Sequence, residues 1–151
     1  MVTLHRDMAA RFWSRHSNPW SGWSRVSTLP PLGGAVAAQS ALAILLVVLW
    51  LAVNPLLFPP PRDDRSWMTR GVLGERLYFA GGPRLRRDLP TLLTLANLPA
   101  FGAFLWFAWR RDAVAAVSTG LLVAVLKFWF LDRMVALYDA DAAAGRSDQA
   151  P

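Results

Sequence analysis

The chain has 151 residues, 54% of them hydrophobic, with a formal net charge of +6 and no cysteine. This length fits one domain, and the lack of cysteine excludes a disulfide framework and a thiol site. Only two histidines are present, and no catalytic, cofactor or nucleotide motif stands out. The sequence therefore predicts no metal site and no cofactor.

Three segments, residues 26–61, 89–109 and 113–126, contain no charged residue and no histidine. A helix needs roughly 20 predominantly apolar residues to cross the hydrocarbon core of a bilayer. We therefore expect an all-α fold, an integral membrane helical bundle with three strong membrane segments in the cell inner (cytoplasmic) membrane. Arginines flank these segments, which favours lipid headgroups over nucleic acid as the partner of the positive charge. Protein partners stay open, including a homo-oligomer.

The first 25 residues form a basic, aromatic stretch in which Leu4, Met8 and Phe12 recur at helical spacing. This pattern predicts an interfacial helix that lies on the membrane surface and ends near His16. Asn18 precedes a proline, which disfavours further helix and predicts a turn at this point.

The first apolar run allows two structures. Residues 32–53 have the length of one span, whereas a short hairpin would use residues 26–38 and 41–53, with a turn near Gln39 and Ser40. Each hairpin arm would reach only about 20 Å. The hairpin gathers thirteen arginines on one side of the membrane against two, whereas a single span divides them nine to six. Because positive charge is normally concentrated on the cytoplasmic side, we favour the hairpin, which gives four spans rather than three.

The segment 54–90 is long for a connection, and long connections are disproportionately functional. It opens on a proline-rich exit that ends the preceding helix near Asn54, and Asp63, Asp64 or Ser66 could cap a short helix through Phe79. Within that helix, Glu75 could act as a general base or ion ligand, although a surface ion pair or a helix anchor explains it as well.

Residues 89–109 form the second predicted span, which Pro99 should kink. The third runs over 113–131 and continues as helix towards Ala144. Residues 1–144 would then form a single helical membrane domain, and 145–151 a disordered tail.

The candidate site consists of polar side chains inside or beside the apolar segments, because polarity is unfavourable there and is often kept for function. These residues are His16, Asn18, Asn54, Glu75, Arg76, Asn97, Lys127, Asp132 and Arg133. Plainer roles exist: interfacial hydrogen bonding for the histidine, backbone capping beside prolines for the asparagines, and interfacial anchoring for the charged groups. We predict that the first two candidates meet the last two at one interface.

Four segments of the chain are distinctive: RHSNPWSGW at residues 15–23, NPLLFPPP at 54–61, GERL at 74–77 and KFWFLDRM at 127–134. They resemble segments of an uncharacterised family of small prokaryotic multi-pass membrane proteins, and the resemblance covers roughly residues 10–138. It implies a membrane location and a helical fold but no reaction, and it makes the polar residues of these segments the preferred site candidates.

Three functions are compatible with these features. The leading one is a non-enzymatic membrane protein, either a scaffold or accessory subunit or a lipid- or partner-binding module. The second is a membrane enzyme acting on a lipid-borne or apolar substrate, with His16, Glu75, Lys127 and Asp132 converging. The third is a small oligomeric transporter that uses the segment 97–99 as a broken helix. Convergence of the polar side chains around a pocket would discriminate among them.

Overall fold

The computed structural model describes residues 15–80 and 88–147, with the side chains of 146 and 147 left out. All regular structure in this part of the chain is helical, which confirms the predicted all-α class. Most of the expected N-terminal interfacial helix lies outside the described residues. Arg15 and His16 are helical and Ser17 is in a turn, so the helix ends where the sequence places its end.

The turn expected at Asn18 is followed at once by a helix that the sequence analysis missed, α2 (Pro19–Val26). The Asn18 side chain accepts a hydrogen bond from the amide of Trp20 at 2.9 Å, and Pro19 occupies the first helical position. Asparagine at the N-cap with proline directly after it is a helix-start signal as well as a turn signal. The helix α3 (Leu29–Ala37) follows after a two-residue break.

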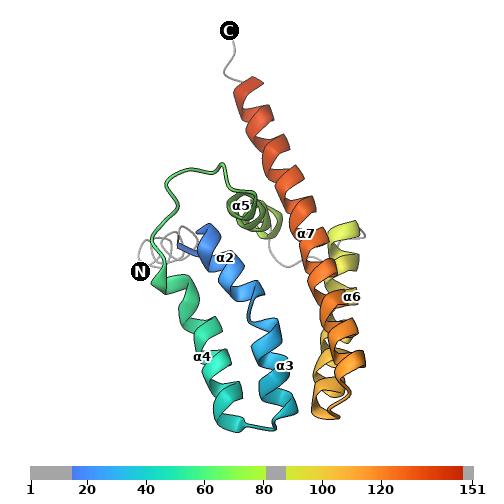
Figure 1. Cartoon of the computed structure of the whole chain (residues 1–151). Helices are drawn as coiled ribbons and strands as arrows, with labels where there is room; N and C mark the ends of the chain where they lie inside the picture. Colours follow the sequence, from blue (N-terminus) through green and yellow to red (C-terminus); the bar gives the residue numbers. More distant parts are fainter. Residues whose placement is uncertain (1–14, 81–87, 148–151) are drawn as a thin grey trace, which may run out of the picture.

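The first apolar run forms a helical hairpin, and the alternative of one continuous helix over 32–53 is wrong. The chain turns at Ala38–Ser40, where Gln39 has a φ of 52°, and α4 (Ala41–Leu57) runs back beside α3 (Figure 1). Ser40 starts α4, since its hydroxyl accepts from the amide of Ala43 at 3.3 Å. The helix α4 also continues past its expected end, through Pro55.

The remaining helices lie where the sequence predicts them. The short helix in the long connection is α5 (Trp67–Phe79), with Ser66 at the N-cap position. The second span is α6 (Leu89–Trp109), capped by Asp88 and continuous through Pro99; the kink expected at this proline stays a prediction. The third is α7 (Ala113–Ser147), which extends into the segment predicted as a tail.

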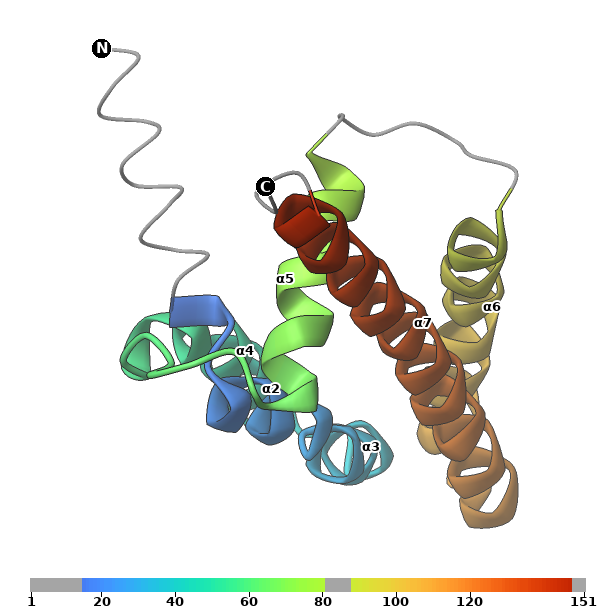
Figure 2. The same ribbon diagram turned by 90° about the horizontal axis from the view of Figure 1, so that it is seen from above.

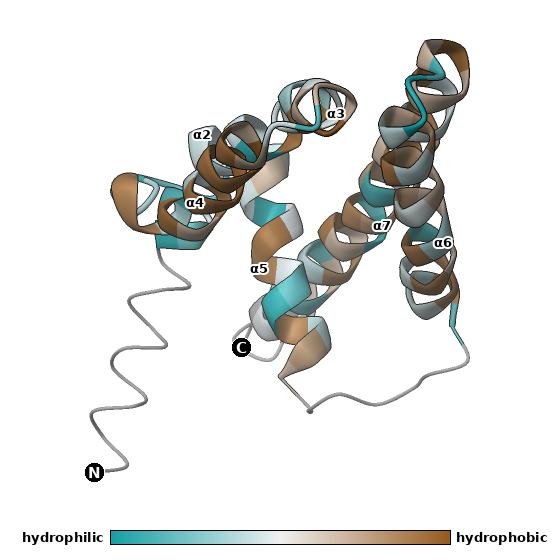
Figure 3. Ribbon diagram, turned by 90° about the horizontal axis from the view of Figure 1, so that it is seen from below, coloured by the Kyte–Doolittle hydropathy of each residue, from teal (hydrophilic) through white to brown (hydrophobic). Residues whose placement is uncertain are grey.

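In the part of the chain that the structure describes, two helices are long and apolar enough to cross a membrane: α6 and the Ala113–Gly145 part of α7. At 1.5 Å per residue they measure about 31 Å and about 50 Å. Only 22% and 17% of their most apolar windows are buried within the protein. A core helix of a soluble protein would be covered on most sides, whereas these leave most of their apolar surface uncovered. Hydrophobic residues run along α4, α6 and α7 (Figure 3).

The helices form two layers, one that ends at the two tight turns and one at the opposite end of the molecule. In Figure 1, α3, α4, α6 and the N-terminal half of α7 lie side by side, while α2, α5 and the C-terminal half of α7 lie at the opposite end from the two tight turns. Figure 2 shows α5 between α2 and α7. The turns are joined directly, because Arg111 donates through Nε to the carbonyl oxygen of Ala37 at 3.0 Å.

Close packing of α5 fixes it between its neighbours. Its Met68 and Val72 are buried with Leu131 and Met134 of α7. A Cβ atom at Gly74 would overlap the backbone carbonyl of Met134, so only glycine allows this approach of α5 to α7.

We therefore expect Gly74→Ala to destabilise the protein by about 3 kcal/mol, at the upper end of the range for overpacked cores. The clash is with backbone, which cannot move aside as a flexible side chain can. The melting temperature of the purified protein in detergent should fall by several degrees. Gly102→Ala on α6 is the matched control, since a Cβ there meets nothing within 4 Å. Equal melting of the two variants would contradict the described packing of α5 on α7.

Candidate functional site

A buried polar network attaches α2 to the end of α4. Asn54 is fully buried; its Oδ1 accepts from the Ser21 hydroxyl at 2.7 Å, and its Nδ2 donates to the Ser24 hydroxyl at 2.8 Å. Asn18 donates through Nδ2 to the carbonyl oxygen of Pro59 at 2.8 Å. Two of the distinctive segments, 15–23 and 54–61, therefore contact each other. Both asparagines make the hydrogen bonds that burial of an amide requires, and their role here is structural.

Beside this network, α2 presents Arg25, which the sequence analysis did not select. Its Nη1 lies 2.9 Å from Nε2 of His16, and its Nε donates to the carbonyl oxygen of Ser21 at 3.2 Å. A guanidinium can only donate, so Nε2 accepts and the imidazole is neutral with its proton on Nδ1. The one signal that could have identified Arg25 is its position as the last charge before the long uncharged run.

The electrostatic surroundings agree with a neutral histidine. Burial, and then the positive charges of Arg25 and Lys127, lower the pKa of His16 from 6.5 to about 4. Burial also lowers the pKa of the Arg25 guanidinium from its usual value, while the nearby Glu75 carboxylate opposes that shift. Arg25 nevertheless stays charged at neutral pH, because an arginine starts from a very high pKa.

An ion pair between α5 and α7 faces this histidine–arginine pair. Nζ of Lys127 lies 3.4 Å from Oε1 of Glu75 and 4.8 Å from the centre of the Phe130 ring. The Glu75 side chain is 21% exposed and that of Lys127 is 46% exposed. Because an ammonium group has three N–H donors, the lysine keeps donors for a further partner beside this ion pair.

These side chains converge on one cavity of about 340 Å³. Most of its lining is apolar, but it is called the polar cavity here for the polar side chains of His16, Arg25, Glu75, Asn97 and Lys127, brought together from α2, α5, α6, α7 and the end of the N-terminal helix. Asn97 is held in place, because its Nδ2 donates to the carbonyl oxygen of Val123 on α7 at 2.9 Å. Four of the nine candidates from the sequence therefore meet here.

Three other candidates lie elsewhere. Asp132 and Arg133 pair with each other at 2.6 Å, with side chains 51% and 46% exposed, and Arg76 is exposed on α5. The expected meeting of His16 and Asn18 with this pair is wrong. The packed side of α7 carries Leu131 and Met134, so the two charged residues between them in sequence point outward.

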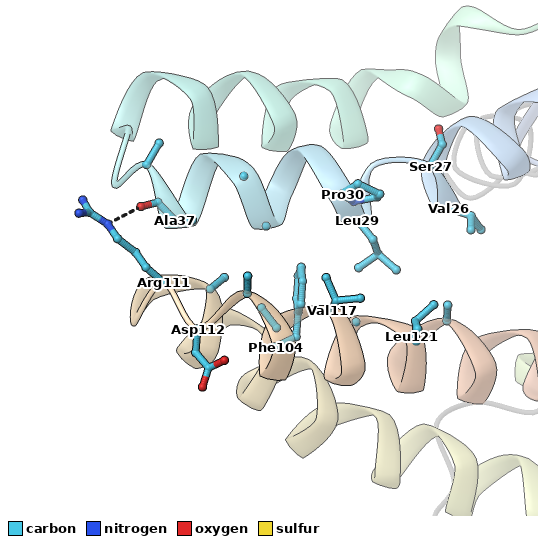
Figure 4. Close-up of a pocket in the computed structure, with 18 residues that line it drawn as sticks. Val26, Ser27, Leu29, Pro30, Ala37, Phe104, Arg111, Asp112, Val117 and Leu121 are labelled. Carbon is cyan, nitrogen blue, oxygen red and sulfur yellow. Dashed lines mark hydrogen bonds between the residues drawn. The ribbon is translucent and has the colours of Figure 1, made fainter.

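A larger, mostly apolar cavity of about 790 Å³ lies beside the polar cavity, between α3 and the α6–α7 pair. Figure 4 shows Leu29 of α3 facing Val117 and Leu121 of α7, with Phe104 of α6 beside Val117 on the side towards Arg111. The two cavities share three lining residues: Val26, Leu29 and Ala124. Because they adjoin at these residues, the two cavities are together called the α3–α7 cleft; its charged groups gather near α2 and α5, and its lining towards the turns is mostly apolar. The bond from Arg111 to Ala37 lies across its far end (Figure 4).

In the described part of the chain, no group of three or more histidines, cysteines or carboxylates could hold a metal ion. The polar end of the cleft instead offers two cations, one carboxylate, a neutral imidazole and an amide, beside a long apolar wall. Such a combination can bind a molecule that has both a charged and an apolar part.

A protein-family model, described as a family of unknown function (DUF6653), matches residues 6–151. Comparisons with curated proteins and with solved structures gave no match.

We expect His16 to stay neutral down to about pH 4 in the folded protein. Because the unfolded chain takes up this proton near pH 6.5, the contribution of His16 to stability is complete above that pH and is lost as the pH falls from 6.5 towards 4. Imidazole ¹⁵N shifts would measure the pKa directly, with His5→Gln to assign the signals. The variant His16→Gln, which keeps a neutral acceptor, should lose this part of the acid sensitivity. A titration near 6.5 would contradict the described environment.

Proposed function

The chain belongs to the DUF6653 family, and we propose that it is a multi-pass protein of the cytoplasmic membrane that binds one amphiphilic lipid in the α3–α7 cleft. The observation that carries this proposal is that the two cavities adjoin, sharing Val26, Leu29 and Ala124 in their linings. A cavity of about 340 Å³ that carries the charged groups lies beside a mostly apolar one of about 790 Å³, and this pairing matches the two parts of a lipid. Both volumes lie in the range of small-molecule binding pockets.

The proposed membrane layer contains α3, α4, α6 and the N-terminal half of α7. The uncovered apolar side chains of the hairpin support this: Leu42, Leu46 and Leu49 of α4 are 67%, 58% and 48% exposed. Soluble monomers rarely leave so long an apolar face open to water. At 17 residues, α4 measures about 26 Å, so it would cross only where the bilayer thins or the polar ends reach inward.

The orientation follows from the arginines. Both tight turns, 38–40 and 110–112, lie at one end of the layer, and α2 and α5 lie at the other (Figure 1). The α2–α5 end and the sequence segments attached to it hold thirteen of the fifteen arginines. The positive-inside rule then places α2 and α5 in the cytoplasm, with the polar end of the cleft at the cytoplasmic headgroups.

Binding explains the polar groups better than catalysis does. Nε2 of His16 already accepts from Arg25, and the low pKa of about 4 makes this imidazole a weak base at neutral pH. Glu75 is paired with Lys127. A transporter built on a broken helix is also less favoured, because α6 is continuous and Asn97 binds α6 to α7.

The orientation predicts which cysteines a membrane-impermeant maleimide reaches in intact cells. The chain has no native cysteine, so single replacements at exposed positions report directly. Ala38→Cys and Arg110→Cys at the turns should react in intact cells, and Arg62→Cys and Asp141→Cys only after permeabilisation. If Ala38→Cys reacted together with Arg62→Cys, the hairpin would not cross the membrane.

Lipid occupancy tests the cleft. We expect native mass spectrometry of the protein, extracted in mild detergent, to show one bound lipid per chain. Val117→Trp should lower this occupancy several-fold, because Val117 lines the apolar part of the cleft. Val114→Trp is the matched control, one turn away on α7, 79% exposed and outside the cleft. Equal loss in both variants, or no bound lipid in the parent protein, would contradict the proposal.

A further inference from the structure

We propose that the polar end of the α3–α7 cleft selects a lipid with an anionic headgroup, and that Arg25 is the residue that binds this group. This inference rests on the proposed lipid-binding function and adds the chemical class of the ligand. It is carried by the charges around the smaller cavity and by the partners of Arg25.

The lining of the polar cavity carries an excess of positive charge. Among the described residues that line it, Arg25 and Lys127 supply two positive charges and Glu75 supplies one negative charge, while His16 is neutral. A single negative charge would balance this set. Removing charges from water without balance is unfavourable, so an anionic group would complement the described part of the lining.

Arg25 is the charge with the clearest need for such a partner. Its two hydrogen bonds in the described structure go to Nε2 of His16 and to the carbonyl oxygen of Ser21, both of them neutral acceptors. Among the described residues, no carboxylate lies within ion-pair distance of it. A guanidinium has five N–H donors arranged to bind phosphate or carboxylate oxygens in pairs, so donors remain for a ligand.

His16 acts as a positioning residue in this arrangement. A carboxylate at the same place would hold the guanidinium equally well but would also neutralise it. A neutral imidazole fixes the direction of Arg25 through the 2.9 Å contact and leaves its charge available. On the other side of the cavity, Lys127 is held by the longer 3.4 Å contact to Glu75 and can share in binding the same anion.

The position of the cluster commits the ligand to a lipid rather than to a free anion. Val26 and Leu29 follow Arg25 closely in sequence and line both cavities. The apolar chain of a lipid whose anionic group binds Arg25 would therefore find apolar surface directly beside that group. A free phosphate would leave the 790 Å³ apolar part unfilled. Basic pockets between membrane helices on the cytoplasmic side are a common way to bind anionic headgroups.

The test compares two lipids with identical chains, phosphatidylglycerol and phosphatidylcholine, titrated into the full-length protein and measured by native mass spectrometry. We expect at least tenfold tighter binding of phosphatidylglycerol, which corresponds to about 1.4 kcal/mol. Arg25→Gln should abolish this preference. Arg76→Gln is the matched control, because it removes one exposed arginine of α5 outside the cavity.

Two changes at one position test the positioning role without removing the arginine. His16→Glu supplies an internal counter-ion and should abolish the preference, whereas His16→Gln keeps a neutral acceptor and should retain it. Melting temperatures of all variants identify any that fail to fold, and the His16 pair decides the question if Arg25→Gln does not fold.

The outcomes separate the two proposals. Equal binding of both lipids to the parent protein would overturn the anionic selectivity and leave lipid binding in place, whereas binding of neither would overturn the proposed function itself. Competition by millimolar inorganic phosphate that fully displaces phosphatidylglycerol would identify a free-anion site and overturn the lipid assignment. A tenfold preference that Arg25→Gln and His16→Glu remove, and Arg76→Gln and His16→Gln keep, supports the inference.

Discussion

The fully buried amide of Asn54 is the contact on which the N-terminal half of the structure depends. Placing an unpaired amide in an apolar interior costs about 1–3 kcal/mol or more, which makes its two serine partners on α2 obligatory. Because Ser21 and Ser24 lie on one side of α2, the network fixes both the rotation of that helix and its position along α4. Arg25 follows directly after this network, and its direction is set by the same contacts.

A second constraint acts on the other half. The glycine at position 74 lets α5 approach the backbone of α7 more closely than any side chain would allow. The next residue along, Glu75, is thereby brought to within 3.4 Å of Lys127. Two different contacts thus place charged groups in the same cavity. The polar network of Asn54 positions Arg25, and the close backbone contact at Gly74 positions Glu75.

Between the two halves lies the cleft, because the hairpin meets α6 and α7 along only part of their length. Phe104 fills the space beside Gly33 and Gly120, and the bond from Arg111 joins the turns at the far end. The space left between α3 and α7 is therefore bridged by a hydrogen bond at the turn end and lined by charged groups at the other end. Its walls are mostly apolar side chains of α3, α6 and α7, which suit the apolar chain of a lipid.

The sequence by itself determined the helical class and the limits of α6, because charged residues and an aspartate cap flank a run of apolar residues long enough to span a bilayer. It left the hairpin open, since neither glycine nor proline marks the turn at Gln39, and it missed α2. Polarity in apolar surroundings pointed correctly to His16 and Lys127, but only the tertiary structure decided their partners. Rotation of α7 is set by its packing on α5, and it turns Asp132 outward while Lys127 faces the cavity. Only the tertiary structure identifies Arg25 as part of the site, because its neighbours come from helices distant in sequence, and local sequence patterns do not encode such contacts.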